Sequence, residues 1–309
     1  MIRADQKMPL AKVLPVLVST MLLAGCAAPS AVPAASPGLP DVLAAETFLA
    51  DIAQNVAGKR LMVSALLPQG VDPHEFQPAP QDAIKIAQSE VLIVNGLGYE
   101  TWLQKSLPDA EGGERLVVVA SDGLIPTASG ARPGADPHLW VDPLNVIRYT
   151  ENIRDGLSKA DPAGAAAYSA NTLAYTAKLR ELDQWIRDEI GQIPPARRLL
   201  VTNHDELRYF AEEYGFVLTG AVIPSVTSEA SPSPQEMASL IQSIKLSGAP
   251  AIFLDVSENQ QLANQIAAES GAKVITGLYI ETLSSAGGPA PTYIDMMKYD
   301  VTLMVKALE

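Results

Sequence analysis

The residues of this 309-residue chain best suited to chemistry are its three histidines, His74, His138 and His204. His74 and His138 each follow Asp-Pro, and His204 follows the β-like run Val-Thr-Asn. Neutral imidazole is the commonest protein ligand of borderline divalent metals, and each of these contexts suits a ligand. Intervals of 64 and 66 residues exclude a local zinc finger. A site that contains all three must therefore be assembled by the fold from distant segments.

Strand-like and helix-like segments alternate along the chain, which predicts an α/β fold. We expect two lobes, each with a mostly parallel sheet flanked by helices. An Asp142-Pro143 pair predicts a helix start, with aspartate as the cap and proline at the first helical position. The other predicted helices cover residues 43–56, 80–89, 163–193, 207–214, 234–246, 258–269 and 293–308, and the predicted strands cover 60–67, 91–94, 115–120, 198–202, 217–223, 251–256 and 273–275.

The longest predicted helix covers residues 163–193 and joins the two lobes. Apolar and aromatic residues recur in it at spacings of three and four, and Pro194-Pro195 ends it. Its length would be roughly 45 Å, which is enough to brace both lobes as one rigid element. The predicted domains are thus an N-terminal lobe over 41–162, this linking helix, and a C-terminal lobe over 194–309.

Four side chains are candidates for one metal site in the cleft between the lobes. Ligands of open α/β sheets sit beyond the carboxyl ends of strands, and His204 and Glu281 each follow a strand-like run. His74 and His138 lie on turns of the first lobe. Three imidazoles and a carboxylate suit zinc or a similar divalent ion. Each imidazole also needs a hydrogen-bond acceptor for the nitrogen that does not bind the metal. Asp72, Asp136, Asp142 and Asp205 are near the histidines in sequence, and most of them are expected to be turn formers or helix caps. The sequence leaves open which of the four accepts from an imidazole.

The beginning of the chain has the pattern of an export signal. A basic start precedes an apolar run over residues 13–23, which is too short to span a bilayer. The run ends Leu-Ala-Gly-Cys26, which resembles the bacterial lipobox and implies a lipidated Cys26 that holds the protein at a membrane. The alternative is a buried free cysteine beside an ordinary signal peptide. We predict a signal peptide over 1–25 and a disordered tether over 26–40, rich in proline, alanine and serine.

The charge of the chain bears on its partners. The formal net charge of −13 argues against nucleic acid, whose phosphates would be repelled, and is compatible with a cationic ligand. No P-loop sequence is present, so we expect no nucleotide hydrolysis by this chain. We also expect a monomer.

Several motifs occur along the chain in the order found in one known family: Pro-His-Glu-Phe-Gln-Pro at 73–78, Asn-Gly-Leu-Gly-Tyr-Glu-Thr-Trp-Leu at 95–103, Pro-His-Leu-Trp-Val-Asp-Pro at 137–143, Asn-His-Asp at 203–205, Leu-Tyr-Ile-Glu-Thr-Leu at 278–283 and Tyr-Ile-Asp-Met-Met-Lys-Tyr at 293–299. On these motifs the chain resembles the metal-binding lipoproteins that serve ABC importers for zinc and manganese, also called cluster A-I or the lipoprotein adhesin family. The resemblance implies two lobes joined by one long helix, with metal in the cleft and His74, His138 and His204 as ligands.

The resemblance implies a receptor and not an enzyme. It would capture Zn²⁺, or next in order Mn²⁺, outside the cytoplasm and pass the ion to a membrane permease driven by a separate ATPase. The long helix would limit lobe motion, so release would require docking to the permease. Capture should weaken below about pH 6.5, where histidines protonate. An adhesion role has no physical support in these residues.

Three departures from the family pattern concern the choice of metal. The fourth ligand position usually holds aspartate, and Glu281 is one methylene longer, so it could bind in another mode or leave its place to water. The third position holds His204 where some relatives have glutamate, and a more nitrogen-rich site favours zinc over manganese. Zinc-specific members often carry a histidine-rich loop before the second histidine, and residues 121–135 contain none.

Three rival interpretations follow from the same residues. Asn-Gly-Leu-Gly at 95–98 follows a strand as a dinucleotide loop would, but the third glycine is missing, so we expect a turn. A secreted zinc hydrolase could use Glu75 or Glu206 as a base, but catalytic zinc needs an open position, and three histidines with a carboxylate close the site. A binding protein for a chelated metal or an organic solute should have a pocket lined by aromatic and basic residues, and aromatics make up only 6% of the chain.

Overall fold

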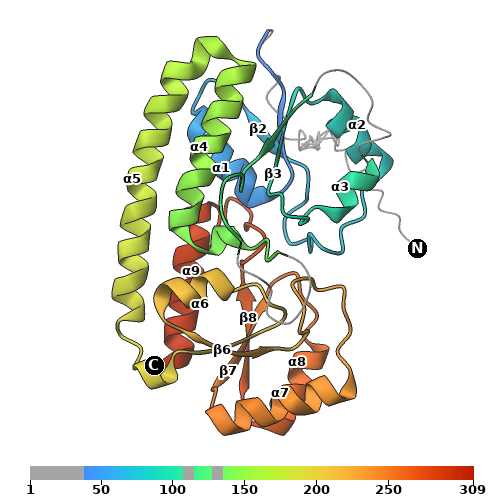
Figure 1. The fold of residues 1–309 in the computed structure, drawn as a ribbon, viewed down its shortest axis with the longest axis vertical. Helices are drawn as coiled ribbons and strands as arrows, with labels where there is room; N and C mark the ends of the chain where they lie inside the picture. Colours follow the sequence, from blue (N-terminus) through green and yellow to red (C-terminus); the bar gives the residue numbers. More distant parts are fainter. Residues whose placement is uncertain (1–37, 107–114, 127–134) are drawn as a thin grey trace, which may run out of the picture. The chain divides into compact units, whose positions relative to one another are not determined.

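Two four-stranded sheets organise the described part of the chain, and every neighbouring pair of strands in them is parallel. The computed structural model describes residues 38–106, 115–126 and 135–309 (Figure 1). The predicted signal peptide, Cys26 and most of the predicted tether lie outside these residues. The α/β class predicted from the sequence, with helices flanking two parallel sheets, is confirmed.

The N-terminal sheet has the strand order β2-β1-β3-β4 and is covered by helices on both faces. Side chains of β1 alternate between the faces, since Val42 and Ala44 pack with α1 and α4, whereas Leu43 packs with residues of α2 and α3. Figure 1 shows these helix pairs on opposite sides of the sheet. The elements are β1 Val42–Ala44, α1 Thr47–Ala57, β2 Val63–Ala65, α2 Pro80–Gln88, β3 Val91–Val94, α3 Thr101–Ser106, β4 Leu116–Val119 and α4 Pro143–Ala160.

The C-terminal sheet repeats this arrangement with the order β6-β5-β7-β8. Val201 and Ile252 face α7 and α8, while Leu200 and Phe253 belong to the large core that also contains α6 and α9. In each sheet the first strand lies between the second and the third in chain order. The elements are β5 Leu199–Thr202, α6 Arg208–Tyr214, β6 Val217–Ala221, α7 Pro234–Ser247, β7 Ala251–Asp255, α8 Gln261–Ser270, β8 Lys273–Leu278 and α9 Tyr293–Leu308.

The predicted helix over residues 43–56 is wrong at its beginning. Val42–Ala44 is strand β1, and the helix starts only at Thr47. A short apolar run has the same composition in a buried strand and in a buried helix. The pairing of β1 with both β2 and β3 decides the outcome, and neither partner is local in sequence. Helix α3 was not predicted, and the other predicted elements are present with ends displaced by no more than three residues.

Helix α5, Ala165–Ile190, is the long helix expected from the sequence, and it ends before Pro194-Pro195. At 1.5 Å per residue, its 26 residues span roughly 39 Å. It packs against α1 and α4 of the first lobe and against α9 of the second, as Figure 1 shows. None of the described helices is both long and apolar enough to cross a membrane.

Helix α9 is a second connection between the lobes. Its first residue, Tyr293, donates its backbone N–H to Asp51 of α1 at 2.9 Å and its hydroxyl to the carbonyl of Trp140 at 2.6 Å. The rest of α9 packs against β7 and β8. Both α5 and α9 therefore connect the two lobes.

Truncation of the inner face of α5 should weaken the whole fold. Leu179 is completely buried in the core that both lobes share, so Leu179→Ala removes packed methyl groups and leaves a cavity. We expect a loss of about 2–5 kcal/mol in the free energy of unfolding, measured by urea denaturation. Leu173→Ala on the same helix is the matched control, because Leu173 is 72% exposed. An equal effect of the two substitutions would contradict this account of the core.

Candidate metal centre

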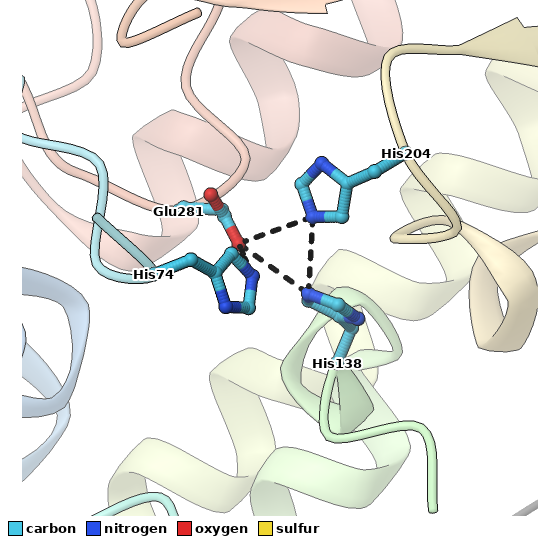
Figure 2. A group of neighbouring side chains, drawn as sticks. All are labelled: His74, His138, His204 and Glu281. Carbon is cyan, nitrogen blue, oxygen red and sulfur yellow. Dashed lines mark hydrogen bonds and ion pairs between the residues drawn. The ribbon is translucent and has the colours of Figure 1, made fainter. Parts of the chain in front are cut away.

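The structure brings together the four side chains that the sequence singled out. His74, His138, His204 and Glu281 each offer one ligand atom, and these atoms all lie within 4.8 Å of one another (Figure 2). His74 is 4% exposed and the other three are at most 1% exposed. Four donors of this kind, removed from water and grouped this closely, form a site of the size of a single ion.

Each of the four side chains follows the carboxyl end of a strand. His74 lies in the segment after β2, His138 in the segment after β4, His204 two residues beyond β5 and Glu281 three residues beyond β8. Parallel strands of one sheet end at the same edge, and the segments that leave these edges carry the ligands. Two ligands thus come from each lobe, as expected from the sequence.

One oxygen of Glu281 is the centre of the group. Its Oε1 lies 3.2 Å from Nε2 of His74, 3.3 Å from Nε2 of His138 and 3.6 Å from Nε2 of His204, and it accepts a hydrogen bond from the Tyr99 hydroxyl at 3.2 Å. Nε2 of His74 and Oε2 of Glu281 are buried without a hydrogen-bond partner. Buried polar atoms normally have a partner, so these two ligand atoms fit a cation placed between the four side chains.

Carboxylates behind two of the imidazoles set the orientation of the rings. Nδ1 of His138 lies 2.8 Å from Oδ1 of Asp136, and Nδ1 of His204 lies 3.1 Å from Oε1 of Glu258. A proton on Nδ1 is donated to the carboxylate, which leaves the Nε2 lone pair of each ring directed toward Glu281. Fixed rings of this kind are already arranged for metal binding.

The four aspartates considered from the sequence have different roles. Asp136 contacts an imidazole, whereas Asp72 accepts the backbone N–H of His74 at 2.8 Å. Asp142 accepts the N–H of Leu144 and caps α4, as a helix start predicts. Asp205 forms a long ion pair with Arg208, with 4.0 Å between Oδ2 and Nη2.

Glu258 and Asp255 were missed by the sequence reasoning. Asp255 ends β7, and its Oδ2 accepts the N–H groups of Ile280 at 2.6 Å and Glu281 at 3.2 Å. From the other lobe, Thr47 accepts the N–H of Leu283 at 2.8 Å. The segment that carries Glu281 is thus held by both lobes. The position of Asp255 at the carboxyl end of a buried strand was a signal that could have found it.

The glycine-rich segment after β3 forms a turn and does not have the geometry of a phosphate loop. Gly96 has a φ of 92°, and a Cβ there would lie 2.5 Å from a methyl carbon of Val119. The N–H groups of Asn95 and Gly96 donate to the carboxylate of Glu100, so they are not free for phosphate. The turn also places Tyr99 beside Glu281.

The electrostatics of the centre keep its carboxylate ionised. Burial alone would raise the pKa of Glu281, but His74, His138 and His204 outweigh burial and hold this pKa well below its usual range. An ionised carboxylate is the form that binds a cation.

The imidazoles hold protons more strongly than free histidine does. Burial would lower the pKa of His138, but Asp136 and Glu281 raise it above its ordinary value. Burial would likewise lower the pKa of His204, and neighbouring carboxylates, with Glu206 foremost, raise it well above the ordinary value. Protons and a metal ion would therefore compete for these nitrogens.

The fold and the centre together define a class of protein: a two-lobed α/β protein with a buried group of three histidines and one carboxylate that could hold a metal ion. Residues 42–307 match the family model described as zinc-uptake complex component A, periplasmic, and the chain belongs to this family. The resemblance inferred from the sequence motifs is confirmed.

Relatives and solved structures agree with the family. The chain is 33% identical over 293 residues to the manganese-binding lipoprotein MntA of Halalkalibacterium halodurans, covering 95% of this chain and 96% of the relative. It is 26% identical to the manganese ABC transporter substrate-binding lipoprotein PsaA of Streptococcus mitis, with coverage of 94% and 96%. The periplasmic zinc-binding protein TroA of Treponema pallidum aligns with a TM-score of 0.81 at 25% identity, covering 88% of this chain and 99% of TroA. These are binding proteins, which confirms the prediction that this chain is not an enzyme.

The role of Asp136 can be tested on the metal-free protein. Asp136→Asn keeps an oxygen that accepts from Nδ1 of His138 but removes the negative charge, so the pKa of His138 should fall. The measurement is an NMR titration of the imidazole signals. Asp205→Asn removes an equal charge without a hydrogen bond to an imidazole and should have a much smaller effect. An unchanged His138 pKa in Asp136→Asn would show that the contact does not control this ring.

Proposed function

We propose that this protein is a lipid-anchored receptor that captures one divalent transition-metal ion outside the cytoplasm and delivers it to the permease of an ABC importer, which a separate ATPase drives. The observation that carries the proposal is the buried group of four ligand atoms within 4.8 Å of one another. His74, His138, His204 and Glu281 are the proposed ligands. Family membership supports the transport role.

The donor set favours Zn²⁺, with Mn²⁺ as the next candidate. Three imidazole nitrogens and one carboxylate match the ligand preference of zinc, and the affinity of such sites for Zn²⁺ exceeds that for Mn²⁺ in the general order of divalent metals. Relatives named for each of these metals match the chain over most of its length. The second oxygen of Glu281 has no partner, so this longer carboxylate could bind through one oxygen or through both.

A bare ion fits the centre better than a chelated metal or an organic solute. The ligand atoms are too close together, and too deeply buried, for a molecule to lie between them. The zinc hydrolase considered from the sequence has no support from the relatives, which are binding proteins.

Release of the ion is proposed to require the permease. The lobes are tied together by α5 and by α9, and the segment that carries Glu281 is held from both sides. A large hinge opening would break these contacts, so small local shifts caused by docking are the proposed route of release.

The proposed anchor is Cys26, followed by a tether that ends near residue 40. The two lobes, over 41–162 and 194–309, and the linking helix over 163–193 are the proposed working parts of a monomer. The sequence Leu-Ala-Gly-Cys26 supports the anchor, and relatives named as lipoproteins match almost the whole chain.

Metal titration of the purified protein is the experiment that tests the receptor. We expect one equivalent of Zn²⁺ to bind tightly and Zn²⁺ to displace Mn²⁺ in competition. His138→Ala removes a central ligand and should weaken Zn²⁺ binding by at least about 100-fold. The free energy of unfolding of the metal-free protein should change by far less than the free energy of Zn²⁺ binding.

Two further titrations control this result. Glu281→Gln keeps the shape of the side chain and removes its charge, so weaker binding would indicate direct ligation by Glu281. Glu269→Gln, on the exposed end of α8, removes a charge outside the centre and should leave binding unchanged. If no first-row ion binds the wild-type protein tightly, the receptor proposal is wrong.

Metal capture should depend strongly on pH. Each imidazole that gains a proton loses its ligand lone pair, so affinity falls as pH falls. Because the pKa values of His138 and His204 are raised, this loss should begin above about pH 6.5, the ordinary value for histidine. With two protons displaced, affinity should change by up to roughly 100-fold per pH unit. Competitive Zn²⁺ titrations across about pH 5–8 would measure the slope, and a flat profile would contradict the assignment of the ligands.

The anchor is tested in cells that export the protein. Cys26→Ala should move the protein from the membrane fraction to the soluble fraction and remove the lipid from its mature N-terminus, as measured by fractionation and mass spectrometry. Ser30→Ala lies in the same segment and should have no effect. A mature wild-type N-terminus that carries no lipid would exclude Cys26 as the anchor.

A further inference from the structure

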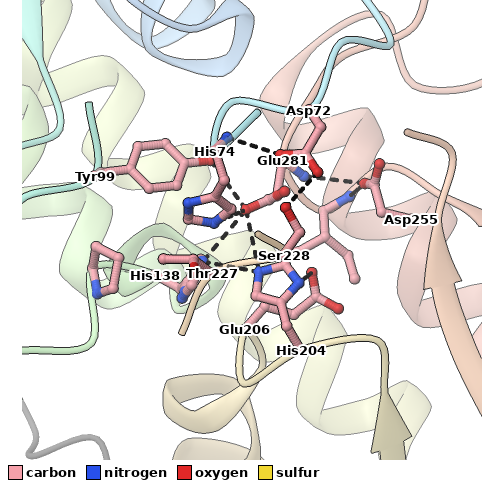
Figure 3. A network of polar contacts seen from close by, with 12 residues as sticks. Asp72, His74, Tyr99, His138, His204, Glu206, Thr227, Ser228, Asp255 and Glu281 are labelled. Atoms are coloured by element: carbon pink, nitrogen blue, oxygen red, sulfur yellow. Dashed lines mark hydrogen bonds and ion pairs between the residues drawn. The ribbon is translucent and has the colours of Figure 1, made fainter. Parts of the chain in front are cut away.

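A second group of metal-binding atoms lies behind the ring of His204. Oxygens of Glu206 and Glu258 lie within 4.8 Å of each other and of His204 (Figure 3 shows His204 and Glu206 in this network). Nδ1 of His204 lies 3.1 Å from Oε1 of Glu258 and 3.8 Å from Oε2 of Glu206. These atoms lie on the opposite edge of the ring from the Nε2 that faces Glu281.

Glu206 is the member of this group whose carboxylate lacks a hydrogen-bond partner. Its side chain is completely buried, and neither carboxylate oxygen makes a hydrogen bond. A buried carboxyl group without a partner is costly, and a cation shared with Glu258 would compensate it. Two carboxylate oxygens and an imidazole nitrogen are suitable ligands for first-row divalent ions.

An acidic surface pocket borders this group at Glu258. It has a volume of about 480 Å³, and its lining includes the carboxylates of Asp72, Glu75, Glu229 and Glu258 and no lysine or arginine among the residues described. Glu258 belongs both to the pocket and to the group behind His204. Walls of one charge sign raise the local concentration of counter-ions, so a hydrated divalent cation would be drawn to this entrance.

We propose that Glu206, Glu258 and Nδ1 of His204 form a second divalent-cation subsite, which takes an ion from the acidic pocket before the ion reaches the four-ligand centre. This subsite rests on the proposed receptor function. It extends that function by assigning the route of entry to one side of the molecule.

The chemistry of the imidazole ring makes the two positions alternate. A neutral imidazole has one lone pair and one N–H, so His204 serves one ion at a time. With an ion at Nδ1 the ring proton is on Nε2, and with an ion at the centre the proton is on Nδ1 and is donated to Glu258. Transfer of the ion therefore moves one proton across the ring and changes no net charge. The subsite should be weaker than the centre, because it offers one imidazole in place of three.

The equilibrium test disables the centre and uses Zn²⁺ alone as the probe. In His74→Ala/His138→Ala we expect one weakly bound equivalent of Zn²⁺. Addition of Glu206→Gln should lower the remaining affinity at least tenfold, and addition of Glu212→Gln, an exposed residue of α6, should change it less than twofold. Absence of residual binding in the double variant, or equal affinity after Glu206→Gln, would overturn the subsite.

A kinetic test in the otherwise wild-type protein does not depend on the double variant. Stopped-flow mixing with Zn²⁺ should show association slowed at least fivefold in Glu206→Gln. Glu212→Gln again provides the charge-matched control. Association as fast as wild type would refute the subsite while tight wild-type binding still supported the receptor, whereas failure of wild type to bind Zn²⁺ would refute the receptor itself.

Discussion

The structure depends on one buried polar cluster, in which three imidazole nitrogens from different segments face a single carboxylate oxygen of Glu281. Such an arrangement is unfavourable without a cation, because lone pairs and charge are removed from water and brought close together. The surrounding contacts hold it in place. Asp255 and Thr47 fix the segment of Glu281 from the two lobes, and Asp136 fixes the ring of His138.

Two helices connect the lobes that supply the site. Helix α5 packs on both lobes. Helix α9 begins in contact with Asp51 and Trp140 of the first lobe and then packs against β7 and β8 of the second. Two such connections restrict rigid-body rotation of the lobes more than one would. In the proposed receptor, binding energy would then be available for selecting an ion by its ligands, since little of it would be needed to order a hinge.

The carboxylates around the centre separate into two kinds. Asp136 and Asp255 each accept several hydrogen bonds and serve to position ligands. Glu206 is buried without such bonds and lies beside the acidic pocket residue Glu258. Positioning carboxylates need donors around them, whereas a carboxylate that lacks donors is suited to a mobile cation. This difference fits the proposed role of Glu206 in ion entry.

The sequence by itself determined the elements whose signals are local. Asp142 at a helix start, the three-and-four spacing along α5, and histidines beyond strand-like runs all depend on neighbours within a few residues. Only the tertiary structure decided that Val42–Ala44 is a strand, because its pairing partners β2 and β3 are distant in sequence. It likewise decided that Glu258, 54 residues from His204, is the acceptor for that ring. Distances between atoms on separate segments depend on packing, and packing is a property of the whole chain.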